Sequence, residues 1–264
     1  MKRKAETEGL LLHTKHALKP NSLGYCGPDE NRVLLESLYE SSPSKRLVST
    51  LTRFEAAYPF VRMIAKATGR PEFDKKVTEA YWIGNSLLDK VSPADFFRFA
   101  QHDLSSSRMR AGKNDGIRKQ DTRSLFKELG TLAKPHHTFY VLGMYARSSI
   151  KSGSENKLLE LMDSCRVSWG RVVQVKKTSL IVERPSLALS NDQLSLTRPL
   201  RKEVHYDPRI PPFSNIHPGD WVSVHWNFAS EKLKPVQLKN LKRYTALDIK
   251  ATNRLVDSGT QALW

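Results

Sequence analysis

The chain has 264 residues, of which 39% are hydrophobic, so it is long enough for one large or two ordinary domains. Its 43 lysines and arginines exceed its 27 acidic residues, and the net charge of +16 favours anionic partners such as nucleic acid or acidic protein surfaces. No apolar run approaches the roughly 18 residues of a membrane helix, and the two cysteines lie far apart, so the sequence argues against a membrane partner and a disulfide framework and predicts a cytoplasmic protein.

Residues 1–150 predict a mostly α-helical domain. The stretch 1–22 has few apolar anchors and indicates a helix or an arm with a frayed tip. Apolar side chains then recur at helical spacing over 45–69 and over 73–91, and Pro59 is expected to kink or split the first of these helices.

A glycine- and proline-rich turn at 21–29 carries Tyr25 and Cys26 and precedes a helical pattern over 33–39. Cys26 has two interpretations. It is either a small residue buried under a tight loop, or a thiolate that a nearby helix N-terminus favours.

Two further clusters stand out in this half. Trp82 and Asn85 flank Gly84 in an aromatic and small-residue cluster, where the glycine is expected to admit the close approach of a neighbour. His136 and His137 follow Pro135 and lead into an apolar segment that is either a buried strand or a short buried helix. Either these histidines close a loop, or one of them lines a pocket together with Cys26.

Residues 151–264 change character from helical to β, after a composition break at 148–154. Short strands are predicted within 167–182 and 200–206, on either side of a polar stretch that we interpret as a connection. Several short strands with turns between them, followed by one or two C-terminal helices, predict a small OB-like β-barrel and an α+β fold overall.

The segment from Gly219 to Ala229 predicts the last strand of this barrel. Val222, Val224 and Trp226 share one face at period two, and His225 points to the other face. A helical pattern is expected to follow directly. The histidine is either a surface residue on a barrel strand or a ligand at its end.

The segment Cys165-Arg166-Val167-Ser168-Trp169-Gly170-Arg171-Val172-Val173 and the segment 219–229, with Glu231-Lys232-Leu233 behind it, resemble the HypC/HupF family of [NiFe]-hydrogenase maturation chaperones. The resemblance covers roughly the last 100 residues. The family's iron-associated cysteine falls on Cys165 and its histidine on His225, whereas here a whole domain precedes the cysteine.

The resemblance implies an iron centre, with cyanide and carbon monoxide as further ligands, held by Cys165 from the first barrel strand and by His225 from the last. A thiolate is a suitable ligand for such a soft iron. It also implies that the partner is a hydrogenase large subunit or a HypD-like maturation scaffold, and that the protein is an accessory factor rather than a conventional enzyme.

Two other functions fit the sequence. A basic small barrel with Trp169, Trp221 and Trp226 is also typical of a nucleic-acid-binding protein, which binds single strands by stacking and charge. The third hypothesis is an enzyme whose site is formed by Cys26, His136 and His137, with Tyr25, Trp82 and Asn85 as further N-terminal candidates.

Overall fold

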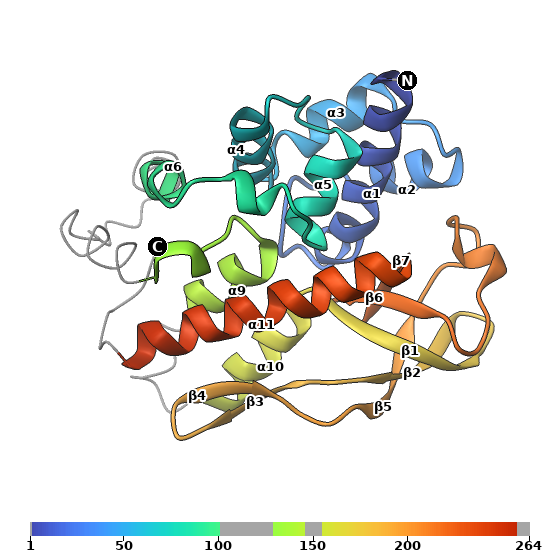
Figure 1. The fold of residues 1–264 in the computed structure, drawn as a ribbon. Coiled ribbons are helices and arrows are strands. Elements are labelled where there is room, and N and C mark those ends of the chain that lie inside the picture. Colours follow the sequence, from blue (N-terminus) through green and yellow to red (C-terminus); the bar gives the residue numbers. More distant parts are fainter. Residues whose placement is uncertain (1, 101–128, 146–154, 258–264) are drawn as a thin grey trace.

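The computed structural model describes residues 2–100, 129–145 and 155–257, and it has the predicted α+β architecture (Figure 1). Helices dominate the N-terminal half, a small closed barrel follows, and a long helix ends the described chain. The composition break at 148–154, expected to separate two domains, lies outside the described residues.

The N-terminal half is built from short helices around α1. The helices are α1 (Lys2–Ser22), α2 (Asn31–Tyr39), α3 (Lys45–Leu51), α4 (Tyr58–Thr68), α5 (Lys75–Trp82), α6 (Pro93–Phe99) and α9 (His137–Tyr145), with 3-10 turns η1 (Leu88–Lys90) and η3 (Gly130–Leu132). Residues 2–22 thus form a helix, and its side chains from Leu10 to Pro20 are mostly buried.

Two predicted helices are each interrupted. The pattern over 45–69 divides into α3 and α4, and Pro59 stands in the first turn of α4, where its missing N–H costs no helical bond. The pattern over 73–91 stops at Trp82, so the expectation of one helix there is wrong. Gly84 has φ of 90°, and the Tyr244 ring lies 2.2 Å from where a Cβ would stand, which confirms the expected close approach.

The barrel has five strands in the order β1-β2-β5-β7-β6, with β6 closing on β1. The strands are β1 (Ser168–Val175), β2 (Ser179–Arg184), β5 (Leu200–His205), β6 (Trp221–His225) and β7 (Phe228–Lys232). Only the β5–β7 pair is parallel. The predicted small OB-like barrel is therefore confirmed.

Two β elements differ from expectation. The polar stretch after β2 contains a hairpin of β3 (Leu187–Ser190) and β4 (Gln193–Leu196), turned by Asn191 and Asp192 at φ of 48° and 60°. A similar left-handed pair, Trp226 and Asn227, turns β6 into β7, so no helix follows β6 directly and Trp226 is not a strand residue.

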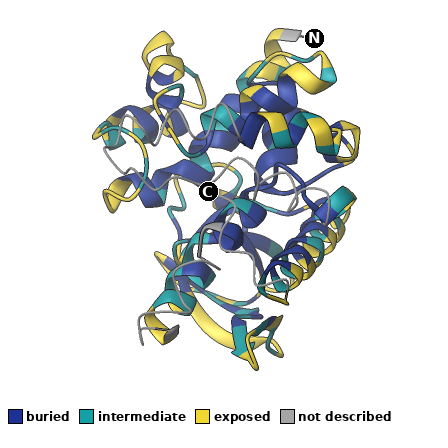
Figure 2. Cartoon of the chain, turned by 90° about the vertical axis from the view of Figure 1, so that its left-hand side faces the viewer, coloured by how far each residue is buried: buried dark blue, intermediate teal, exposed yellow. Residues whose placement is uncertain are grey.

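Helices α10 (Glu155–Cys165), α11 (Pro235–Asp257) and α1 join the two halves. The α1 helix packs on β6 and β7, while α11 lies against α9, β4 and β1. One apolar core continues from the N-terminal helices into the barrel, and Figure 2 shows the buried residues at the centre of both halves. None of the helices within the described ranges has the length and apolar character required to cross a membrane.

Candidate metal centre

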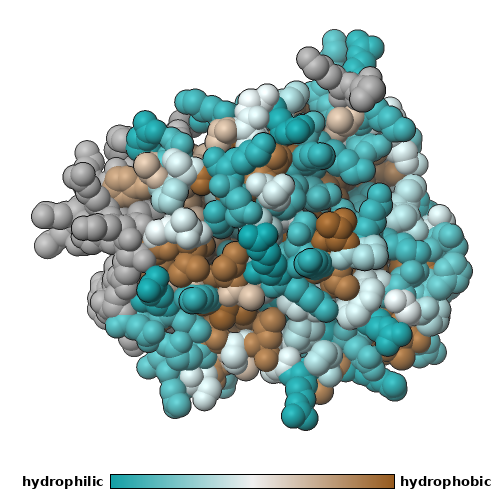
Figure 3. Space-filling model, in the orientation of Figure 1, coloured by the Kyte–Doolittle hydropathy of each residue, from teal (hydrophilic) through white to brown (hydrophobic). Residues whose placement is uncertain are grey.

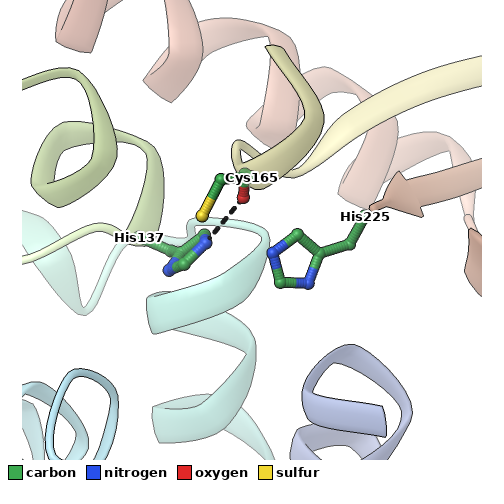
Figure 4. Close-up of side chains that lie close together, drawn as sticks. All are labelled: His137, Cys165 and His225. Atoms are coloured by element: carbon green, nitrogen blue, oxygen red, sulfur yellow. Dashed lines mark hydrogen bonds between the residues drawn. The ribbon is translucent and has the colours of Figure 1, made fainter. Parts of the chain in front are cut away.

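Three side chains from three separate elements converge between the helices and the barrel (Figure 4). His137 is the first residue of α9, Cys165 is the last residue of α10, and His225 is the last residue of β6. One ligand atom from each, a ring nitrogen or the sulfur, lies within 4.8 Å of the other two. The predicted meeting of Cys165 and His225 is therefore present, and His137 joins them.

The expectation that Cys165 belongs to the first barrel strand is wrong, because α10 continues through it. A carboxylate fixes this helix end: Asp163 accepts hydrogen bonds from Arg166 at 2.8 and 3.0 Å, from Arg184 at 2.5 Å and from the Leu187 amide at 2.8 Å. The Arg166 side chain is fully buried. This network holds the cysteine at the junction of α10 with the barrel.

His225 is 2% exposed, so the interpretation as a surface histidine is wrong. The second face of β6 is covered by α1, which the sequence pattern of the strand did not reveal. The Nδ1 of His225 lies 2.7 Å from the His16 carbonyl, and a carbonyl can only accept, so the neutral ring carries its proton on Nδ1. Its Nε2 is buried and makes no well-formed hydrogen bond to the described residues, although the Cys165 carbonyl lies near enough to raise the pKa of the ring.

His137 has both ring nitrogens engaged. Its Nε2–H donates to the Cys165 carbonyl at 2.9 Å, the bond drawn in Figure 4, and its Nδ1 accepts from the Tyr81 hydroxyl at 3.1 Å. The Tyr81 hydroxyl also lies 3.5 Å from the Ala56 carbonyl. Ligation of a metal by His137 therefore requires one of its two hydrogen bonds, to Tyr81 or to the Cys165 carbonyl, to break.

Trp82 lies at the centre of four imidazoles. Its ring centroid is 4.6 Å from that of His137, 5.3 Å from both His13 and His16, and 5.5 Å from His225. Its indole N–H donates to His13 Nδ1 at 3.1 Å. The wall of the site is therefore aromatic and buried, and the predicted N-terminal candidate Trp82 belongs to the same site as Cys165.

Burial sets the protonation of the ligands. It lowers the pKa of His225 to about 4 and the pKa of His137 well below its ordinary value, and the like charge of the two rings adds to the effect on His137. Burial raises the pKa of the Cys165 thiol to about 12, and the nearby Trp226 indole opposes this only in part. At neutral pH both imidazoles are uncharged, as metal ligation requires, while the thiol must first lose its proton.

The donor set fits a transition metal. A thiolate and two imidazoles suit zinc, iron, cobalt or copper rather than magnesium or calcium. Ligand atoms around such an ion stand about 3.5 Å apart, so the three side chains need to close by roughly 1 Å. Three protein ligands leave a fourth position for water, a small ligand or a donor from another protein.

The remaining predicted residues do not join the three ligands. Cys26 is partly buried and lies near enough to Cys165 to add to the rise in the pKa of that thiol. Burial raises the pKa of Cys26 itself to about 11, which favours the small residue under a tight loop over a helix-activated thiolate. His136 pairs with Asp248 at 2.6 Å, with both side chains buried, rather than with Cys26. The amide of Asn85 binds the Lys76 carbonyl and the Leu87 amide, which is a structural role.

Tyr25 is 63% exposed and stacks on Trp226 with ring centroids 4.4 Å apart. The contacts among the described residues therefore do not assemble Cys26, His136 and His137 into one site. The pairing of His137 with Cys165 and His225 was missed, because no sequence spacing links a helix start to a distant barrel strand.

A family model matches residues 5–259, nearly the whole chain, and its description is a family of unknown function, DUF6390. The chain belongs to DUF6390. The match spans both the helical half and the barrel, so all three ligands of the candidate metal centre lie inside the DUF6390 region. Comparison with curated proteins and with solved structures gave no match.

Proposed function

We propose that the protein is a metal-site assembly factor that holds one transition-metal ion between His137, Cys165 and His225 and passes it to a partner. The single observation that carries this proposal is the convergence of one sulfur and two imidazoles within 4.8 Å in a buried site. Neutral imidazoles and an open fourth position suit binding followed by transfer.

The resemblance to HypC/HupF chaperones narrows the proposal to iron, with cyanide and carbon monoxide as further ligands. The two residues on which the family's cysteine and histidine fall are two of the three that converge here. On this proposal the partner is a hydrogenase large subunit or a HypD-like scaffold, and the site is in the cytoplasm, where a free thiol stays reduced.

The surface suits an acidic partner. Hydrophilic side chains dominate the face seen in Figure 3, and the chain carries a net charge of +16. The alternative of nucleic-acid binding finds less support. Trp169 is buried, Trp221 lies under the Lys242 ammonium at 4.8 Å, and Trp226 is stacked on Tyr25. Trp169 therefore offers no exposed ring for stacking, and one face of both Trp221 and Trp226 is already covered by this chain.

The test is anaerobic expression together with hydrogenase and maturation proteins, followed by measurement of bound iron and of infrared bands from cyanide and carbon monoxide. The variants Cys165→Ala and His225→Ala are each expected to lose both the bound iron and the infrared bands of cyanide and carbon monoxide. The matched control is His205→Ala, because His205 is exposed on β5 and is not one of the three converging residues. Iron content that is equal in Cys165→Ala and the parent protein would contradict the proposal.

A further inference from the structure

Helix α1 contains a proline within its last turn, and this proline changes the bonding of one carbonyl. In an α-helix the carbonyl of residue 16 accepts from the N–H of residue 20. Residue 20 is Pro20, which has no N–H. The proline ring also crowds the carbonyl four residues before it and turns that carbonyl away from the helix axis. The His16 carbonyl is therefore left without its regular helical partner.

The side chain of His225 donates a hydrogen bond to this His16 carbonyl. Its Nδ1 lies 2.7 Å from the His16 oxygen, a short and buried hydrogen bond between α1 and the end of β6. This bond assigns the ring proton to Nδ1 and leaves the lone pair on Nε2, which is buried and makes no well-formed hydrogen bond to the described residues. A metal-binding histidine is held in the same way, by donation of its other N–H to a carbonyl or carboxylate.

The side chain of His16 fixes the same turn of α1 against β6. Its Nδ1–H donates to the Leu12 carbonyl at 3.0 Å, and its Nε2 accepts from the Ser223 hydroxyl at 3.1 Å. Ser223 and His225 are two residues apart on one face of β6, so His16 binds both, one through its ring and the other through its main chain. These two bonds to His16 therefore fix the His16 carbonyl opposite the His225 imidazole.

We propose that Pro20 is a positioning residue for His225. It keeps the His16 carbonyl free for the imidazole, and thereby fixes the tautomer in which Nε2 faces Cys165 and His137. This explains why a residue that is strongly unfavourable inside a helix stands in the last turn of α1. The effect on the ring proton stands by itself, whereas the consequence for metal affinity rests on the proposed function.

The test replaces the proline by a residue that has an N–H. In Pro20→Ala the new amide competes with His225 for the His16 carbonyl. Two-dimensional NMR of the metal-free protein, correlating ring nitrogens with ring protons, is expected to show the Nδ1–H tautomer of His225 in the parent chain and a mixture with Nε2–H in Pro20→Ala. Pro93→Ala is the matched control, because Pro93 stands in the first turn of α6, where a missing N–H breaks no helical bond.

Two further readouts separate positioning from mere stability. Pro20→Ala is expected to unfold at a higher temperature than the parent chain, because alanine is far more favourable than proline inside a helix, and yet to bind Co²⁺ about tenfold more weakly. An unchanged His225 tautomer in folded Pro20→Ala overturns the inference. A shifted tautomer in a protein whose parent chain binds no metal supports the inference and contradicts the proposed function instead.

Discussion

Within the candidate metal centre, Cys165 alone must lose a proton before it can ligate. Burial raises the pKa of its thiol to about 12, while the pKa of His225 is lowered to about 4 and that of His137 lies well below its ordinary value. Across the neutral range the thiol is therefore protonated and both imidazoles are neutral. Metal binding then releases one proton, and it comes from sulfur.

The affinity for Co²⁺ is accordingly expected to rise about tenfold for each pH unit between about pH 6 and pH 8, because the fraction of thiolate rises tenfold. Titration against a competing chelator measures this slope. Cys165→Ser removes the thiol and is expected to flatten it. A slope near a hundredfold per unit in the parent chain would mean that a histidine also loses a proton, contrary to the burial of both rings.

The position of Cys165 depends on how the end of helix α10 is held. Asp163 joins α10 to β2 and β3 through Arg184 and the Leu187 amide, and it also neutralises the buried Arg166. The two arginines hold the pKa of the Asp163 carboxyl below its usual value, although burial acts in the opposite direction. The carboxylate is therefore charged in the folded protein at neutral pH.

Asp163→Asn is expected to lower the free energy of unfolding by about 3 kcal/mol, because it leaves Arg166 charged and buried without its counter-ion. Urea denaturation measures the loss. Glu160→Gln is the matched control, since Glu160 is an exposed carboxylate on the same helix and its replacement should change the free energy by less than about 0.5 kcal/mol. Equal stability of Asp163→Asn and Glu160→Gln would show that the network does not hold the helix end.

Elements whose signal is local could be predicted from the sequence. The alternation around Val222 and Val224 predicted β6, and the β1–β2 hairpin followed from its apolar runs and central lysines. The β3–β4 hairpin was missed because its side chains are short and polar and its turn uses Asn191 and Asp192 rather than glycine. The end of α5 was missed because Gly84 was read as a helical residue.

The grouping of the ligands depended on tertiary structure that periodicity cannot reveal. Cys165 and His225 were paired from a resemblance, whereas His137 was assigned to a separate N-terminal site. His137 lies beside Cys165 and His225 because α9 packs against α10 and α5, and no spacing in the sequence predicts that packing. Similarly, the sequence of β6 predicts a solvent-exposed second face, whereas in the structure helix α1 covers that face.

For the molecule as a whole, the contact between helices and barrel buries several neutral histidines. Burial lowers the pKa of His13 and His16 to about 3, alongside the lowered values of His137 and His225. In the unfolded chain these groups titrate near 6.5. Their contribution to stability is therefore complete above pH 6.5 and is lost as pH falls toward the folded values. The raised pKa of the buried Asp248 acts in the opposite direction, but it is one group against four.

Stability is therefore expected to fall steeply on mild acidification, by up to about 1.4 kcal/mol per pH unit for each of these histidines once the pH is below about 6.5. Urea unfolding at about pH 7, 6 and 5 measures the slope. In His205→Asn, which lacks only an exposed histidine, the slope should be unchanged. A stability that is level from pH 7 to pH 5 would mean that the histidines are not buried in this contact.

X-ray absorption spectroscopy of the cobalt- or zinc-loaded protein shows directly whether His137, Cys165 and His225 hold the metal. We expect a coordination shell of one sulfur at about 2.3 Å and two imidazole nitrogens at about 2.0 Å, with the sulfur lost in Cys165→Ser. A shell of oxygen and nitrogen only, unchanged in Cys165→Ser, would mean that the metal binds elsewhere and that these three residues do not form its site.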